Sequence, residues 1–194
     1  MGDREAVLAA VGKALAMLAD ERAQDADGPS VPMHFEPVEQ DLPADTDALW
    51  QRFEERLTGL GGRVVEPGAL EELLESQVCI DRDALPLLAG IPWVLTDDPW
   101  EAGAGITLAE VAVAETGSLL VSAGPGRRRL ASLAPPVHVA LVRRESIVST
   151  LEEGLARLGD RTSVLISGPS RTADIEGVLV RGVHGPRELW VIPI

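Results

Sequence analysis

A carboxylate stands in the middle of an apolar strand pattern in "EVAVAETGSLLVSA", at 110–123. Side chains alternate between the two faces of a strand, so Glu115 continues the face that carries Val111 and Val113. Burial beside these valines would raise the pKa of the carboxyl and suit it to proton transfer or nucleophilic attack. The alternative is a structural Glu at a hairpin rim, bonded to water or to backbone amides. Glu115 is therefore the candidate catalytic residue.

A glycine-rich loop that runs into three arginines follows directly, in "GPGRRRLASL" at 124–133. Glycines let backbone amides approach an oxyanion, and the arginines add charge that a carboxylate or a phosphate would neutralise. Surface ion pairs with the many acidic residues of the chain are the alternative explanation. The loop completes neither the G-x-G-x-x-G nor the P-loop pattern, which excludes those nucleotide-binding motifs. The glycines of this loop and its three arginines, Arg127, Arg128 and Arg129, are the candidate anion contacts.

A third stretch, "ISGPSRTADIE" at 166–176, places hydroxyls and free amides where a predicted strand ends. The carboxyl ends of parallel strands are where α/β folds bind ligands. A helix is predicted over 174–180, and capping of this helix is the alternative role of the loop. Asp174 and Glu176 in its first turn would repel an anion. The candidate ligand contacts in this loop are Ser167, Gly168, Ser170 and Thr172.

Three histidines and one cysteine limit the metal and cofactor chemistry of the chain. His184 lies in a glycine-flanked loop, where it is free to serve a site, whereas His138 between valines fits a core histidine with satisfied hydrogen bonds. No two histidines have the spacing of metal ligands, and Cys79 alone cannot supply the ligands of a zinc or iron–sulfur site. We therefore expect no metal and no cofactor in this chain, and any iron–sulfur cluster in a partner protein.

The chain is strongly acidic, with a net charge of −14 at pH 7 over 194 residues, and Lys13 is its only lysine. Nucleic acids and anionic membrane surfaces attract concentrated positive charge, so both are excluded as general partners. The longest apolar run, "LPLLAGIPWVL", is too short and too interrupted to span a bilayer. The first residues lack a basic segment before an apolar one, so we expect a cytoplasmic protein without membrane insertion.

These stretches depend on the surrounding elements for their positions. Apolar residues repeat at helical spacing over 1–20, which predicts an amphipathic helix, and 21–45 lose this periodicity, which predicts a linker or a draped segment. From residue 46 onward helical and strand patterns alternate, beginning with a helix capped by Thr46 or Asp47. A β-hairpin interrupts the alternation at the dipeptide Thr-Gly before Ser118.

Helices are predicted over 67–75 and 146–158, besides the three named above. Strands are predicted over 62–65, 78–80, 135–142 and 188–194. Another short apolar run lies at 91–97, and 163–170 is predicted as a strand that runs into a loop. Strands that alternate with helices favour parallel pairing, because a crossover connection is then available. The pattern predicts one α/β domain over 46–194, with a mostly parallel, helix-covered sheet and a β-hairpin insertion.

Two long stretches, "GITLAEVAVAETGSLLVSAGPGRRRLASLAPPVHVALV" and "ISGPSRTADIEGVLVRGVHGPRELWVIPI", resemble the LUD-domain family, most closely its lactate-utilisation protein C branch. The resemblance spans roughly 49–194 and implies a fold similar to the sugar-isomerase and CoA-transferase-like α/β proteins. Within the arginine run it favours Arg129 as the site residue. The ligand-binding positions that it implies, beside Glu115, are Thr116, Gly124, Gly126, Arg129, Ser167, Gly168, Ser170, Thr172 and His184.

The resemblance implies a cytoplasmic accessory subunit of an iron–sulfur-dependent system that oxidises L-lactate to pyruvate. The implied partners are an iron–sulfur protein that also carries a LUD domain and a cysteine-rich CCG-motif protein. We expect a small-anion pocket with Glu115, the Gly-Pro-Gly loop and Arg129 on one wall and the 167–170 loop opposite. Two other functions stay open: a stand-alone isomerase or acyl-transfer enzyme that uses Glu115, and a small-molecule sensor.

Overall fold

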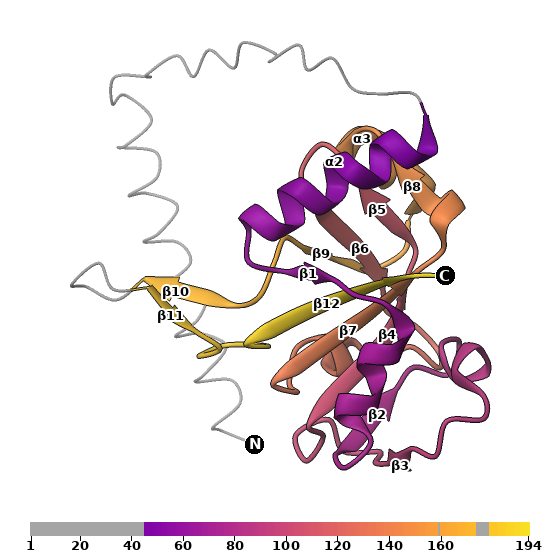
Figure 1. The fold of residues 1–194 in the computed structure, drawn as a ribbon, viewed down its shortest axis with the longest axis vertical. Coiled ribbons are helices and arrows are strands. Elements are labelled where there is room, and N and C mark those ends of the chain that lie inside the picture. The colour runs from indigo at the N-terminus through magenta and orange to yellow at the C-terminus, as the bar shows by residue number, and fades with distance from the viewer. Residues whose placement is uncertain (1–44, 159, 174–178) are drawn as a thin grey trace, which may run out of the picture. The chain divides into compact units, whose positions relative to one another are not determined.

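The computed structural model describes residues 45–158, 160–173 and 179–194. The helix predicted over 1–20 lies outside these residues, and so does the linker predicted over 21–45, except for its last residue. In the described part of the chain, strands and helices follow one another closely, as Figure 1 shows. None of the helices described here has the length and apolar character needed to cross a membrane.

Helix α2 (Thr46–Gly59) is the first described element. Its N-cap is Asp45, not the predicted Thr46 or Asp47, and the Asp45 carboxylate accepts a backbone N–H of the first turn at 3.2 Å. The helix ends at two glycines, as predicted, because Gly61 adopts a φ of +86° that favours glycine. Apolar residues at helical spacing bury one face of the helix; they are Leu49, Trp50, Phe53 and Leu57.

Six parallel strands of the described chain form a large sheet in the order β1-β12-β7-β4-β2-β3. The three long strands at its centre are in register, with Val137 beside both Ala104 and Glu188. This sheet confirms the predicted mostly parallel α/β architecture. In chain order the strands are β1 (Arg63–Val64), β2 (Gln77–Ile80), β3 (Val94–Leu95), β4 (Ala104–Ala109), β7 (Val137–Val142) and β12 (Glu188–Pro193).

The predicted β-hairpin belongs to a second sheet, whose four described strands run in the order β8-β5-β6-β9. Strands β5 and β6 pair antiparallel, and the turn glycine, Gly117, has a φ of +67°. A Cβ at Gly117 would collide with the backbone of Leu57, so the turn packs closely on α2. The strands are β5 (Val111–Val113), β6 (Ser118–Ser122), β8 (Ile147–Val148) and β9 (Ser163–Ile166).

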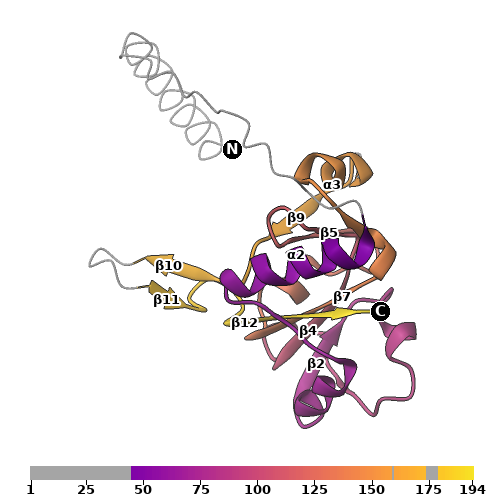
Figure 2. The same cartoon turned by 45° about the horizontal axis from the view of Figure 1, so that its top comes forward.

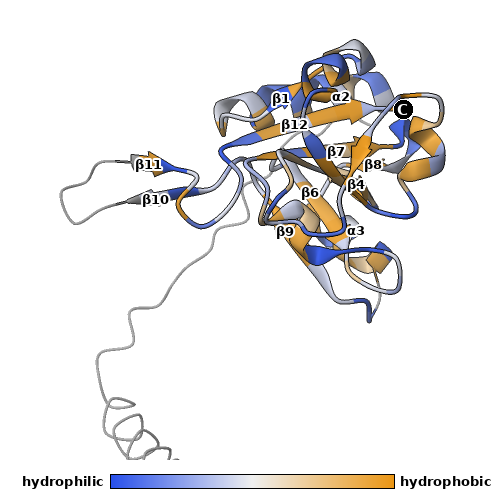
Figure 3. Cartoon of the chain, turned by 90° about the horizontal axis from the view of Figure 1, so that it is seen from below, coloured by the Kyte–Doolittle hydropathy of each residue, from blue (hydrophilic) through white to orange (hydrophobic). Residues whose placement is uncertain are grey.

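The described elements stack in layers, and Figure 2 shows α3 (Leu151–Leu158), the small sheet, α2 and the large sheet one after another. One apolar core surrounds α2 between the two sheets, and another lies between the small sheet and α3. A third core lies beneath η1 (Pro67–Leu73) and η2 (Leu85–Leu88) on the other face of the large sheet. Strands β7 and β12 are therefore buried on both faces and are mostly hydrophobic in Figure 3.

Three predicted helices differ from the structure. The helix predicted over 67–75 is the 3-10 helix η1, and the one predicted over 146–158 begins at Leu151, after η4 (Arg144–Ser146) and β8. The helix predicted over 174–180 is wrong at its end, because β11 (Leu179–Arg181) pairs antiparallel with β10 (Arg171–Ala173). Residues 174–178 lie outside the described chain. Figure 1 shows this hairpin extending away from the sheets.

Candidate functional site

The structure divides the predicted pocket between the two ends of strand β7. The Gly-Pro-Gly loop lies at the carboxyl end of the large sheet, and the 167–170 loop lies near the amino end of β7. His138 marks one end, and Arg143 follows it by five positions, which is roughly 17 Å along a strand. Contrary to the prediction, the two loops do not face each other across one pocket. We name the two sites the arginine cleft and the histidine cavity.

The arginine cleft has a volume of about 580 Å³ and lies where three neighbouring strands end. Arg82 comes shortly after β2, Glu110 directly after β4 and Arg143 directly after β7. The crevice at the carboxyl ends of parallel strands is the usual ligand site of open α/β sheets. The residues that line the cleft are Arg82, Asp83, Pro86, Leu108, Ala109, Glu110, Arg127 and Arg143.

Arg127 neutralises both carboxylates of the cleft. Its Nε lies 2.7 Å from Oδ2 of Asp83, and its Nη1 donates to Oε1 of Glu110. Arg161 adds a second donor to the same oxygen of Glu110 at 3.1 Å. The two carboxylates are thus held by Arg127 and Arg161, and they form no ion pair with Arg82 or Arg143.

Arg82 and Arg143 form no ion pair with a residue that the structure describes. Their charge is available to an anion, and a guanidinium offers paired N–H donors to a carboxylate or a phosphate. Gly126, with a φ of +82°, supports Arg82, whose backbone N–H donates to the Gly126 carbonyl at 2.9 Å. A bridge between Gly124 and Arg127 closes the same turn. The predicted glycines therefore position the cleft.

The other two arginines of the loop do not line the arginine cleft. Arg128 forms an ion pair with Asp97 at 2.7 Å, as the alternative explanation expected. Arg129 begins η3 (Arg129–Ser132) and is exposed, without a side-chain hydrogen bond to a described residue. Its role as an anion contact stays a prediction.

Asp81 is a residue of this region that the sequence motifs do not indicate. It directly follows β2, is 1% exposed, and accepts the backbone N–H of Arg128 at 2.7 Å. Burial raises the pKa of its carboxyl to about 6, and the neighbouring guanidinium of Arg127 lowers it by a smaller amount. A buried ionisable group at the carboxyl end of a parallel sheet is typical of functional sites. The signal in the sequence is an acidic residue placed directly after a short apolar strand.

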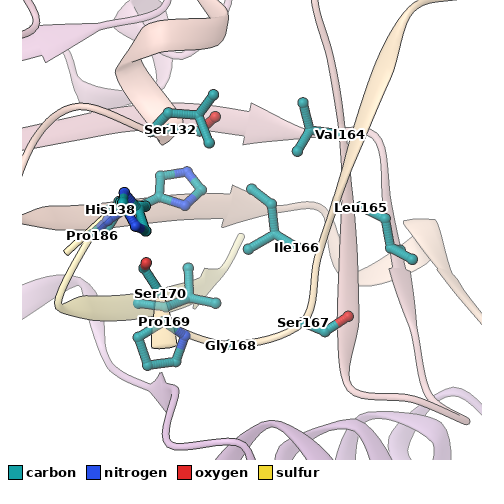
Figure 4. Close-up of a pocket in the computed structure, with 14 residues that line it drawn as sticks. Ser132, His138, Val164, Leu165, Ile166, Ser167, Gly168, Pro169, Ser170 and Pro186 are labelled. Atoms are coloured by element: carbon teal, nitrogen blue, oxygen red, sulfur yellow. The ribbon is translucent and has the colours of Figure 1, made fainter. Parts of the chain in front are cut away.

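The histidine cavity, with a volume of about 220 Å³, lies between β9, the loop that follows it and the segment before β12 (Figure 4). It also contains His138, which the valine pattern had assigned to the core. The hydroxyl of Ser167 lies 2.6 Å from that of Ser118, which ties the loop to the hairpin. Four of the predicted ligand contacts line this cavity: Ser167, Gly168, Ser170 and His184.

Glu115, Thr116 and Thr172 line neither the arginine cleft nor the histidine cavity. Oε2 of Glu115 accepts the backbone N–H of Leu151 at 3.1 Å, so this carboxylate caps the start of α3. Oγ1 of Thr116 is buried in the hairpin turn without a partner among the described residues. Thr172 pairs with Val180 across the β10–β11 hairpin. The structure therefore favours the structural interpretation of Glu115.

We expect Glu115→Ala to lower the free energy of unfolding by about 1 kcal/mol, because the first N–H of α3 loses its acceptor. Glu115→Gln should recover most of this loss, since the amide oxygen can still accept. Urea unfolding of both variants measures the effect, with Glu54→Ala on the exposed face of α2 as the matched control. A Glu115→Gln variant that is fully stable but inactive would restore the catalytic interpretation.

The described residues contain no group of three or more His, Cys, Asp and Glu side chains placed to hold a metal ion. The single cysteine, Cys79, is buried beside Ala102 and Ala131. Burial raises the pKa of its thiol, which keeps it protonated and poorly reactive near neutral pH. The absence of a cofactor from this chain stays a prediction.

Known proteins resemble the chain in sequence and in fold. The LUD domain family model matches residues 95–194. A lactate utilization protein C from Deinococcus radiodurans is 33% identical over an alignment 191 positions long, and the match covers 85% of this chain and 88% of that protein. A protein of the same name from Geobacillus is 31% identical over 103 residues, or 48% of this chain and 43% of the relative.

A solved structure provides a comparison of the fold. The crystal structure of a DUF162 family protein from Deinococcus radiodurans matches with a TM-score of 0.59 and 24% sequence identity. The match covers 78% of this chain and 99% of that one. It supports the α/β architecture described above.

Proposed function

The chain belongs to the LUD-domain family, and from this premise we propose that it serves lactate utilisation as an accessory subunit in the oxidation of L-lactate to pyruvate. Relatives named lactate utilization protein C support the metabolic role. The chain has one cysteine, so the thiolate ligands of an iron–sulfur cluster would come from partner proteins. The proposed partners are an iron–sulfur protein with its own LUD domain and a cysteine-rich CCG-motif protein, both in the cytoplasm.

The arginine cleft carries the ligand part of the proposal. Lactate and pyruvate are small carboxylates, and guanidinium groups bind carboxylates through charge-assisted hydrogen bonds. Arg82 and Arg143 have no ion pair with a described residue and lie beside a polar cavity at the carboxyl end of the sheet. We infer that they hold the carboxylate of lactate or pyruvate, while the electrons pass to centres in the partner proteins.

The alternative functions require different roles of Glu115 and of the arginine cleft. An isomerase or acyl-transfer enzyme would need the Glu115 carboxylate as a base or a nucleophile, but this group already accepts a helix N–H. A small-molecule sensor would use the same arginine cleft without the iron–sulfur partners. Binding experiments alone therefore do not distinguish a sensor from the proposed accessory subunit.

We expect Arg82→Gln and Arg143→Gln each to weaken lactate binding about tenfold or more, because a hydrogen bond to a charged group contributes about 1.5–3 kcal/mol. Titration calorimetry with L-lactate and with pyruvate measures the dissociation constants. Arg52→Gln on α2 removes the same charge at a residue that does not line the cleft, and this variant should bind like the wild type. Equal affinities for the two cleft variants and the control would exclude the cleft as the carboxylate site.

Cells that grow on L-lactate test the accessory role. Deletion of the gene should abolish this growth, the wild-type chain should restore it, and a chain carrying both Arg82→Gln and Arg143→Gln should not. A tagged chain should co-purify with both iron–sulfur partners, identified by mass spectrometry. Lactate binding without co-purification and without a growth defect would favour the sensor.

A further inference from the structure

His138 lines the histidine cavity, and one of its ring nitrogens is buried without a hydrogen-bond partner among the described residues. The residue is 1% exposed, and its Nε2 lies 2.9 Å from Oγ1 of Thr107. Its Nδ1 is buried and has no partner in the part of the chain that the structure describes. An unpaired buried polar atom costs about 1–3 kcal/mol, so such atoms in folded proteins call for a bound water or ligand. The expected core histidine is thus satisfied on one side only.

The walls around this nitrogen are mostly apolar. Figure 4 shows the imidazole of His138 directed toward Ile166, with the hydroxyl of Ser170 facing the same space. The hydroxyl of Ser132, on another wall, already donates to the carbonyl of Arg129 at 2.9 Å. Carbon surfaces come from β9, from β12 and from three loops, through Leu133, Val164, Ile166, Pro169, Pro186 and Leu189.

The described wall of the histidine cavity contains no carboxylate, ammonium or guanidinium group. Its described lining residues include no Asp, Glu, Lys or Arg. Burial lowers the pKa of His138 to about 4, so the imidazole is neutral near pH 7. Apart from the imidazole of His184, which also lines the cavity, a charged ligand would meet no counter-charge here, at a penalty of several kcal/mol. The surroundings therefore favour an uncharged occupant, in contrast to the arginine cleft.

The hydrogen-bond partner of His138 makes a hydroxyl the best match for Nδ1. The Thr107 hydroxyl can donate to Nε2 or accept from it, so Nδ1 is a donor in one tautomer and an acceptor in the other. A carbonyl oxygen pairs with the donor only, whereas a hydroxyl pairs with either tautomer. The cavity of about 220 Å³ is larger than an apolar cavity of about 150 Å³ that holds benzene. A six-membered ring with one small substituent therefore fits.

We propose that the histidine cavity is a second binding site, which takes an uncharged, ring-sized alcohol or phenol whose hydroxyl pairs with Nδ1 of His138. The apolar walls would enclose the ring, and the Ser170 hydroxyl faces the same space as the imidazole. No residue lines both this cavity and the arginine cleft, so the site does not depend on the lactate assignment.

Phenol is the probe for this site, and benzene is its matched control, because it has the same ring without the hydroxyl. In nitrogen-15 NMR spectra of the wild-type protein, phenol should shift the Nδ1 resonance of His138. Phenol should also bind up to about tenfold more tightly than benzene, which corresponds to one hydrogen bond. His138→Leu should remove this preference, and Arg143→Gln in the arginine cleft should keep it.

Three results would overturn the proposal. Saturating phenol could leave the Nδ1 resonance unchanged, phenol and benzene could bind equally well to the wild type, or a water on Nδ1 could resist displacement by phenol. The last result would assign the cavity to solvent. All three are read from the wild-type protein, so the test holds even if His138→Leu does not fold. Failure of lactate binding at the arginine cleft would leave these results unaffected.

Discussion

Asp81→Asn is expected to stabilise the protein by about 3 kcal/mol at pH 8, where the wild type must keep a buried carboxylate ionised. Burial raises the pKa of Asp81 from 3.8 to about 6, and each pKa unit corresponds to about 1.4 kcal/mol between the two protonation states. The amide of Asn avoids this ionisation. It also keeps an oxygen that can accept the backbone N–H of Arg128, as Asp81 does at 2.7 Å.

The stabilisation by Asp81→Asn should increase as the pH rises. The folded-state pKa of Asp81 lies above its ordinary value of 3.8, so between about pH 4 and pH 6 the folded protein binds more protons than the unfolded chain. Its contribution to stability therefore falls as the pH rises through this range. Below about pH 4 the variant and the wild type should be equally stable, and above about pH 6 the full difference should appear.

The contribution of His138 to stability depends on pH in the opposite direction, over an overlapping pH range. Burial lowers its pKa from 6.5 to about 4, so its contribution is present above pH 6.5 and is lost as the pH falls toward 4. In the wild type the two contributions partly cancel between about pH 4 and pH 6. Asp81→Asn removes one of them and should reveal a steeper loss of stability in acid.

Urea unfolding at pH 4, 6 and 8 measures the effect of Asp81→Asn. Asp98→Asn is the matched control, because Asp98 is exposed and an amide can still accept the backbone N–H of Trp100. The control should change the free energy of unfolding by less than about 0.5 kcal/mol at each pH. A loss of stability in Asp81→Asn at pH 8 would show that Arg127 and Arg128 stabilise the carboxylate more than burial penalises it.

A buried carboxylate that lowers stability is expected where function requires it. Asp81 directly precedes Arg82 and Asp83, which line the arginine cleft. We therefore expect the stabilised Asp81→Asn protein to support slower growth on L-lactate. Growth at the wild-type rate would separate Asp81 from the proposed function without changing the stability prediction.

Sequence patterns a few residues long correctly predicted the elements whose conformation is determined by neighbouring residues. Apolar spacing predicted α2, and the dipeptide Thr116-Gly117 predicted the hairpin turn, where a left-handed glycine is needed. Strand β4 was not predicted, because it is buried on both faces and therefore lacks alternation, and only Glu110 separates it from β5. The helix predicted over 174–180 was wrong at its last two residues, because pairing with β10 determines the conformation of β11.

The candidate site depends on contacts between residues that are far apart in the sequence. Less of the site than of the local elements could therefore be predicted. The composition of the Gly-Pro-Gly loop and of the 167–170 loop indicated two ligand loops, but not that they lie near opposite ends of β7. The Glu115 carboxylate accepts the backbone N–H of Leu151, which is 36 positions away in the sequence. Arg143 belongs to no motif, and its place in the cleft follows only from the alignment of β7 with its neighbours.

Gly105→Ala is expected to lower the free energy of unfolding by about 3 kcal/mol or more, the largest loss that we predict for a single methyl group. Gly105 lies in β4, between Cys79 of β2 and His138 of β7. A Cβ at this position would overlap the backbone carbonyl of Ala131 in η3. Because the obstacle is backbone, no side-chain rotation relieves the overlap, and η3 or β4 must move.

The displacement of η3 should also change both sites, because this short helix connects the Gly-Pro-Gly loop to the segment that leads into β7. Gly68→Ala is the matched control, since a Cβ at Gly68 meets no atom within 4 Å. That substitution should leave stability unchanged or raise it by up to about 1 kcal/mol through the unfolded chain. Urea unfolding, with lactate and phenol titrations, measures all three properties. A Gly105→Ala protein within about 1 kcal/mol of the wild type would show that η3 can shift without strain, and η3 would then not fix the geometry of either site.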